Sequence, residues 1–210
     1  DNVATNNTGG ILVFSLPELP KKTGTNTRVY NNKIFENNHE NFAKEGNIVA
    51  TIPPGTGMLI MANKNVHVYD NEFRDNNTSN VSIVSYLATQ RPFNDPEYSP
   101  YAEGIYLHEN TFSGGGADPK GEIGLLFKGL FPGEEVPDIV YDGIVDESKK
   151  VDGELPAEVR LYVSNNEGAE FANINLSEFM ETNTPNVSRD LAPHEGSLPE
   201  LPPITIEGIQ

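Results

Sequence analysis

The segment NVHVYDNEFRDNN, residues 65–77, decides the fold of this chain. It opens with apolar residues in alternation, as a strand with one buried face does, and it ends on asparagine and aspartate, which favour turns. Two other segments align with its last eleven residues without a gap: RVYNNKIFENN from residue 28 and YLHENTFSGGG from residue 106. Three asparagines then share one position at spacings of 39 residues: Asn32, Asn71 and Asn110. The apolar positions are in phase as well, so the chain contains a repeat.

Short apolar runs separate these copies, at residues 9–16, 56–63 and 80–87. They are rich in β-forming residues and lack the length and the 3.6-residue period of a helix. Each repeat therefore carries at least two strands. One coil of a stacked solenoid would consist of a strand, an amide turn, a second strand and a loop. Successive coils lie about 4.8 Å apart. Because asparagine tolerates left-handed backbone and can bond to the same amide in the next coil, we expect Asn32, Asn71 and Asn110 to form a turn ladder.

The later chain continues the pattern less regularly. We predict further strands within residues 122–129, 138–146, 157–166 and 168–176, which would complete a β-solenoid over residues 1–176. Residues 177–210 are proline-rich and acidic. We expect this tail to run extended along the outside of the solenoid, with ITIEGI (204–209) as a candidate edge strand.

The repeated VYxNxF pattern followed by asparagine pairs resembles the right-handed parallel β-helix superfamily, and its spacing is similar to that of bacterial secreted and periplasmic β-helix-repeat proteins. The resemblance covers residues 1–176 and implies an all-β fold, a right-handed parallel β-helix, with a secreted or periplasmic location. The superfamily includes pectate and alginate lyases, mannuronan epimerases and noncatalytic binding proteins. The resemblance is therefore specific for fold and leaves activity open.

Charge excludes some partners. The chain has 14 basic and 31 acidic residues and a formal net charge of -17, which would repel a phosphate backbone or an anionic membrane. It has no cysteine, so disulfides and thiolate metal sites are excluded. No apolar run approaches the roughly 20 residues that span a bilayer. We expect neither nucleic-acid binding nor membrane insertion.

The first apolar run, in NNTGGILVF (residues 6–14), reads like the middle of an ongoing coil. A solenoid end needs a polar cap, because an open coil exposes its apolar lumen and unpaired strand edges. We therefore expect this end to meet further N-terminal β-helix coils, from the same precursor or from another chain.

Strand alternation around the inward Val29, Val68 and Leu107 places two rows of side chains outside. One row is Tyr30, Tyr69 and His108, and the other is Arg28, His67 and Tyr106. Rings and cations at stacked spacing suit a polysaccharide, since rings cover a sugar's apolar face and donors bind its hydroxyls or carboxylates. The candidate binding residues are Tyr30, Tyr69, Tyr106 and His108. The alternative is a solvent-facing ladder whose side chains only pack on each other.

A catalytic interpretation needs a proton carrier and a way to acidify a uronate. The candidate bases are His67, His108, Tyr69 and Arg28. Asp70 and Glu109, which align at the turn, are candidate ligands for Ca²⁺, an ion that takes six to eight oxygen ligands and that lyases of the superfamily use. With 31 acidic residues in the chain, however, such pairs also arise by chance.

Two classes of function remain. The first is a noncatalytic module of a larger secreted or periplasmic protein that binds glycan or a protein partner. The second is a polyuronate lyase or epimerase that uses Ca²⁺ and a His, Tyr or Arg base, although neither the DPH-type epimerase motif nor a paired-Asp hydrolase site is found. A groove between the loops 88–104 and 129–137 with His67 or His108 facing a carboxylate would favour the enzyme. A flat face with both histidines solvated would favour the module.

Overall fold

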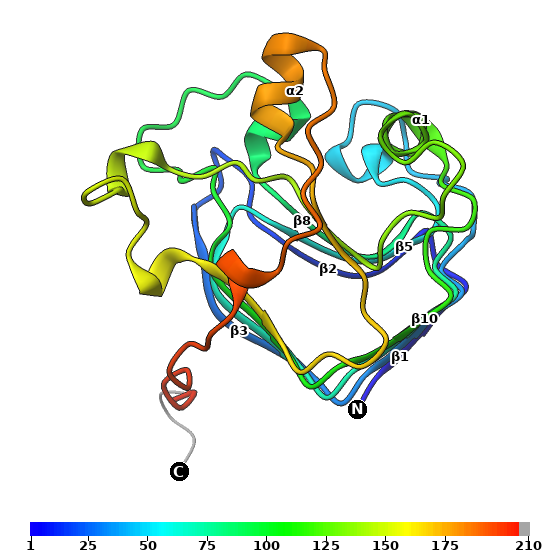
Figure 1. The fold of residues 1–210 in the computed structure, drawn as a ribbon, viewed down its shortest axis with the longest axis horizontal. Helices are drawn as coiled ribbons and strands as arrows, with labels where there is room; N and C mark the ends of the chain where they lie inside the picture. The colour runs from blue at the N-terminus through cyan, green and yellow to red at the C-terminus, as the bar shows by residue number, and fades with distance from the viewer. Residues whose placement is uncertain (206–210) are drawn as a thin grey trace.

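The computed structural model describes residues 1–205 and consists mostly of short strands in three parallel sheets, with few helices. In Figure 1 the strands of successive turns overlie one another around a three-sided outline. The chain passes through the sheets in the same order in each turn, so the architecture is solenoid-like. We call the sheets A, B and C.

Each sheet collects the equivalent strands of successive turns. Sheet A has the order β1 (Val3–Thr5), β4 (Lys33–Phe35), β7 (Glu72–Arg74) and β10 (Thr111–Ser113). Sheet B has the order β13 (Phe171–Asn173), β11 (Ile139–Tyr141), β8 (Ser79–Val84), β5 (Thr56–Met61) and β2 (Gly9–Phe14). Sheet C has the order β12 (Leu161–Ser164), β9 (Glu103–His108), β6 (Asn63–Tyr69) and β3 (Gly24–Tyr30). A turn thus has three strands, and the sequence had identified two of them.

Strand register confirms the alignment of the three repeats. In sheet C, Arg28 pairs with His67 and His67 with Tyr106, while Tyr69 lies between Tyr30 and His108. In sheet A, Phe73 pairs with both Ile34 and Phe112. These apolar residues point into the lumen, where the rings of Phe73 and Phe112 stack at 5.0 Å. Burial of one such residue per strand holds the turns together.

The predicted asparagines meet at the corner between sheets C and A. The Nδ2 of Asn32 donates to Oδ1 of Asn71 at 2.9 Å, and the Nδ2 of Asn71 donates to Oδ1 of Asn110 at 2.9 Å. Asn2 and Asn166 extend this stack at its two ends. One detail differs from expectation: the residue with left-handed backbone is the one before each asparagine, namely Asn31, Asp70 and Glu109. The asparagine itself satisfies the main-chain groups that the corner leaves free.

A second stack, which the sequence analysis did not identify, lies at the next corner. Asn7 donates to Asn37 and Asn37 to Asn76. In the following turn the aligned position is Gly115, whose missing side chain leaves room for Asn80. Asn80 accepts from Asn76 at 2.8 Å and donates to Asp138 at 2.7 Å. Both corners are therefore held by buried side-chain amides.

Sheet B is covered on its outer face as well as its inner one. Strand β5 is buried at every position, which explains why its sequence reads as a continuous apolar run. The covering elements are η1 (Ile48–Thr51), η2 (Tyr86–Thr89), α1 (Gly121–Leu130) and α2 (Leu176–Thr182). Figure 1 shows them outside β2, β5 and β8. Among the described residues, no α-helix packs on the outer face of sheet C.

The strand prediction for residues 122–129 is wrong, because this run forms helix α1. Gly124, Phe127 and Leu130 are buried at three-residue spacing along one side of the helix. Glu122 in the first turn and Lys128 in the last turn complement the helix dipole. An apolar run of this length fits a buried strand or a short helix, and here packing against the outer face of sheet B selects the helix.

The tail after residue 176 begins within α2 and then returns to the solenoid. Asn173 and Ser188 form an antiparallel bridge, and Leu191 packs against the lumen core. The turn η5 (Ala192–His194) places the His194 ring 4.9 Å from that of Phe171. Ile204 and Thr205 are outside any strand, and the rest of the candidate edge strand, residues 206–209, lies outside the described residues. The short η3 (Glu147–Lys149) and η4 (Ala157–Val159) lie in the loop before β12.

Within the part of the chain that the structure describes, no helix has the length and the apolar character needed to cross a membrane.

Candidate functional site

The first predicted row forms a column of rings on the outer face of sheet C. The rings of Tyr30 and Tyr69 stack with centroids 5.2 Å apart and planes 4° apart. Tyr69 and His108 follow at 5.1 Å and 15°. This spacing is close to that of neighbouring strands, because register alone brings the three rings together. The ring faces turn toward each other along the stack, so edges, hydroxyl and N–H groups are what the column offers outward.

The second row joins the first in one cluster. The Tyr106 ring stacks on that of His108 at 4.1 Å, and His67 meets Tyr106 edge to face at 5.5 Å. The hydroxyl of Tyr106 also lies within hydrogen-bond distance, 3.2 Å, of the Ser164 hydroxyl on the next strand. Every candidate binding residue therefore belongs to one aromatic and histidine face, which we call the ring face: Tyr30, Tyr69, Tyr106 and His108, with Arg28 and His67 beside them.

His67, which the sequence places on an open outer row, is buried. It is 6% exposed, and its Nε2 has no hydrogen-bond partner. Burial lowers the pKa of His67, and the nearby His108 and Arg28 lower it further. The ring is thus neutral at pH 7 and has no carboxylate to orient it. A catalytic proton carrier needs access to substrate or water, and His67 lacks it in this arrangement.

The other candidate bases also lack the environment of a buried catalytic base. Burial, together with the neighbouring Tyr30, raises the pKa of Tyr69, so its phenol stays protonated at neutral pH. His108 does face a carboxylate, with its Nδ1 3.1 Å from Glu109, but Glu109 is exposed at the corner. Arg28 is engaged with main-chain carbonyls. The ring face can donate and accept hydrogen bonds, and its contact between His108 and the Glu109 carboxylate lies at the exposed corner.

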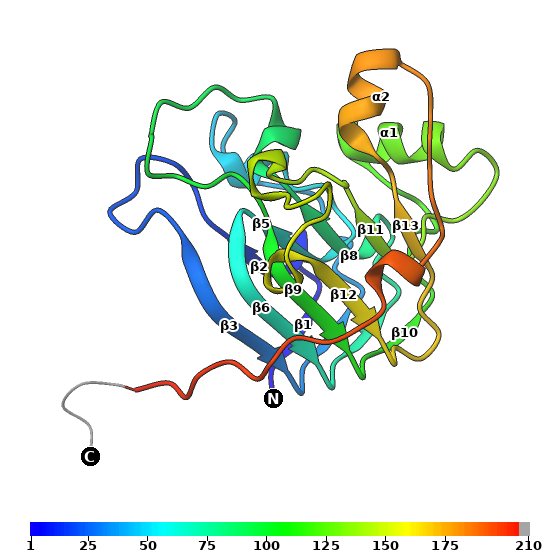
Figure 2. The same ribbon diagram turned by 60° about the vertical axis from the view of Figure 1, so that its left-hand side comes forward.

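The sequence analysis missed what covers this face. Residues 196–202, which we call the proline segment, cross the ends of the sheet C strands (Figure 2). At one edge, the hydroxyl of Ser164 on β12 donates to the Gly196 carbonyl at 3.3 Å. At the other edge the Arg28 Nη2 on β3 donates to the carbonyls of Leu201, at 2.6 Å, and Pro202, at 2.8 Å. Composition marked this segment as extended, but no local signal indicated where it docks.

The candidate calcium ligands lie at the corner and not in a cleft. Asp70 and Glu109 have φ values of 54° and 56° and exposed side chains. Their positions are set by the turn that precedes each stacked asparagine. Among residues 1–205 no group of three or more His, Cys, Asp or Glu side chains is placed to hold a metal ion.

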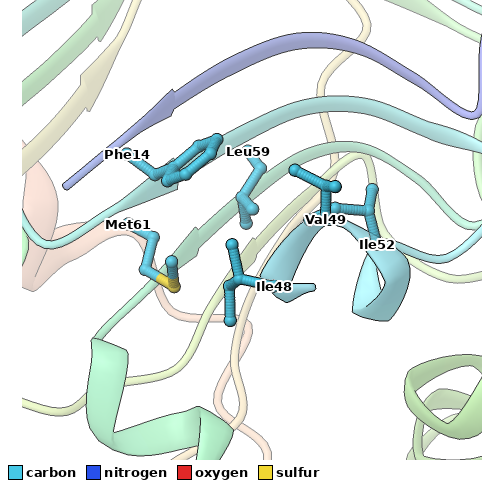
Figure 3. A pocket seen from close by; sticks show the side chains of 6 residues that line it. All are labelled: Phe14, Ile48, Val49, Ile52, Leu59 and Met61. Atoms are coloured by element: carbon cyan, nitrogen blue, oxygen red, sulfur yellow. The ribbon is translucent and has the colours of Figure 1, made fainter. Parts of the chain in front are cut away.

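The hollows of the molecule lie elsewhere. A cavity of about 10 Å³ under η1 is lined by six apolar side chains, among them Phe14, Ile48 and Met61 (Figure 3). It has the volume of about one water molecule and nothing polar to bind one. A larger cleft of about 500 Å³ beside β10 is lined in part by acidic residues and by Arg189, which bridges two of them, Glu134 and Glu170. Neither hollow includes a residue of the ring face.

Comparisons of the chain with protein-family models, with curated proteins and with solved structures gave no match.

Proposed function

We propose that this chain is a right-handed parallel β-helix that serves as a noncatalytic binding module of a secreted or periplasmic bacterial protein, and that the ring face of sheet C binds an extended ligand. The right hand follows from the rule that crossovers between parallel strands of one sheet are right-handed in about 98% of cases. The observation that carries the binding role is the column Tyr30, Tyr69 and His108, held in register on the outer face of sheet C.

The geometry suits a linear ligand. The column runs along the solenoid, so it offers a similar group about every 4.8 Å, as a polymer would require. Aromatic residues with polar edges are the side chains that binding surfaces favour. The ligand is a glycan or an extended segment of a protein partner, since both present repeated polar groups along a line.

The environments of His67 and Tyr69 support binding over turnover. His67 is buried and without a carboxylate partner, and the phenol of Tyr69 is held protonated. A lyase would need a base within hydrogen-bond reach of the proton it removes. The ring face contains residues of suitable type, but the environments of His67 and Tyr69 favour their neutral, hydrogen-bonding forms.

The test combines turnover with binding. The whole chain is incubated with alginate and pectate, with Ca²⁺ or with a chelator, and the ultraviolet absorbance of unsaturated product is followed. We expect no absorbance change. Calcium-dependent absorbance that disappears in His67→Ala or His108→Ala would make the protein a lyase and refute the noncatalytic role.

Binding is measured by calorimetry with oligouronates and with extended peptides. Tyr69→Ala should weaken binding of whichever ligand is found by tenfold or more, because Tyr69 is the middle ring of the column. Tyr101→Phe, a tyrosine outside the ring face, is the control and should leave the affinity unchanged. Equal effects of the two substitutions would exclude the ring face as the site.

A further inference from the structure

The ring face already has an occupant, the proline segment. It spans the sheet from Ser164 on β12 to Arg28 on β3, and the Glu200 carboxylate is near enough to raise the pKa of Tyr69, although less than burial and Tyr30 do. The segment thus runs across the strands and along the column, which is the path proposed above for a ligand.

The burial pattern of the segment is that of a polyproline II helix docked on one side. Leu198 and Leu201 are half-buried, whereas Pro199, Glu200 and Pro202 are exposed. A polyproline II helix has three residues per turn, so residues three apart share a side. Such helices bind in aromatic-lined grooves, where their rigidity limits the entropy lost on docking.

The docked shape is not dictated by local sequence alone. Residues 197–202 read SLPELP, and the same six residues occur at positions 15–20. In that earlier copy Glu18 has a φ of 64° and its N–H donates to Asp95, so the hexapeptide makes a turn. In residues 197–202 no φ is positive. The ring face therefore selects the extended form.

The segment is held by few polar contacts. Within the described residues, no main-chain to main-chain hydrogen bond joins 196–205 to sheet C. The Arg28 Nη1 and the His67 Nε2 are both buried without a partner. A buried polar atom without a hydrogen-bond partner is unfavourable, so a ligand that hydrogen-bonds to these two nitrogens would compete with the segment.

From these contacts we infer that the ring face is a recognition surface for an extended, proline-containing peptide of the Leu-Pro-x-Leu-Pro kind, and that the proline segment is its built-in occupant, which a partner peptide displaces. This inference rests on the proposed function, because it names the ligand class of the same face. Arg28 reads main-chain carbonyls, and the face takes up one leucine per turn of the peptide.

The first experiment asks whether the segment detaches in the whole chain. The protein has no cysteine, so spin labels at Glu122→Cys on α1 and Thr205→Cys after the segment report one distance. We expect a narrow distance distribution that broadens in Arg28→Ala. Arg160→Ala is the control, since Arg160 also donates to a main-chain carbonyl, that of Leu155 at 2.6 Å, away from the segment. A distribution that stays narrow in Arg28→Ala would overturn the inference.

The second experiment uses a fluorescent peptide of residues 197–203, a scrambled peptide and an oligouronate as probes. Leu201→Ser weakens the docking of the proline segment and leaves the ring face intact. It should therefore raise the affinity for the 197–203 peptide tenfold or more. Leu19→Ser changes the same place in the other hexapeptide and should alter the affinity less than twofold. The scrambled peptide should not bind.

The outcomes separate the two proposals. Peptide binding that Leu201→Ser strengthens supports the inference. Oligouronate binding to the ring face without peptide binding overturns the inference and retains the binding module. If neither probe binds the whole chain or Leu201→Ser, both proposals are refuted.

Discussion

The stack of asparagines makes a strong prediction about Asn71, its middle member. Its Oδ1 accepts from both the main-chain N–H and the Nδ2 of Asn32, and its Nδ2 donates to the carbonyls of Val29 and Tyr69 and to Asn110. Asn71→Leu keeps the branch at Cγ and removes all of these side-chain contacts. Two buried donors on Asn32 then lose their acceptor.

The magnitude follows from those two donors. A buried donor left without a partner costs about 1–3 kcal/mol, so Asn71→Leu should lower the free energy of unfolding by about 2–6 kcal/mol. That is a large part of the 5–15 kcal/mol typical of a domain. The assay is urea denaturation followed by circular dichroism in the β region.

Asn2 provides the matched control, because it lies at the solvent-exposed end of the same stack. Its Nδ2 donates to Asn32 at 2.9 Å, but water can replace that bond. Asn2→Leu should therefore change the free energy of unfolding by less than about 1 kcal/mol. If Asn71→Leu is as stable as the wild type, or if Asn2→Leu is equally destabilised, the stack does not stabilise the corner as described.

Three further predictions concern titration and glycine positions. Burial raises the pKa of Asp142 to about 7, so the native state holds this proton more tightly than the unfolded chain does. The free energy of unfolding should therefore fall by up to about 4 kcal/mol as the pH rises from 4 to 7. Asp142→Asn should lack this pH dependence. Burial lowers the pKa of His67 below its ordinary 6.5, so its contribution to stability should be complete above pH 6.5 and decline as pH falls, and its ring resonances should titrate below that value by NMR. Gly57→Ala places a Cβ 2.5 Å from the Asn80 carbonyl oxygen and should lower the free energy of unfolding by about 1–3 kcal/mol. Gly129→Ala in α1 meets nothing within 4 Å and should raise the free energy of unfolding by about 0.5–1 kcal/mol. Chemical denaturation that ranks these two variants the other way would contradict the packing described.

The repeat at residues 28, 67 and 106 was enough to predict the register of sheets A and C. Several positions coincide in each copy, and a shift of one residue would turn every apolar side chain outward. The second stack was harder to see, because its third aligned residue is Gly115 and Asn80 fills the place from another strand. Position in the repeat did not indicate that substitution.

The ring face was predicted as a set of residues but not as an environment. Alternation placed Arg28, His67 and Tyr106 in one row correctly. It could not show that His67 is buried, because the covering chain reaches Arg28 from 173 residues away. Long-range docking of an extended segment leaves no periodic pattern. Helix α1 escaped prediction for a related reason, since its apolar side packs on residues outside the run itself, among them Val140 on β11 and Ala172 on β13.

The corner stacks also make the position of the next coil independent of the length of the loop before it. Asn32, Asn71 and Asn110 are 39 residues apart, whereas Asn110 and Asn166 are 56 apart, and the same amide contact forms in each case. The additional residues form loops over sheet B, and the following coil keeps the register of the stack. A scaffold of this kind accepts inserted peptides in those loops, while one residue added at a corner would displace the outward side chains of the following strands.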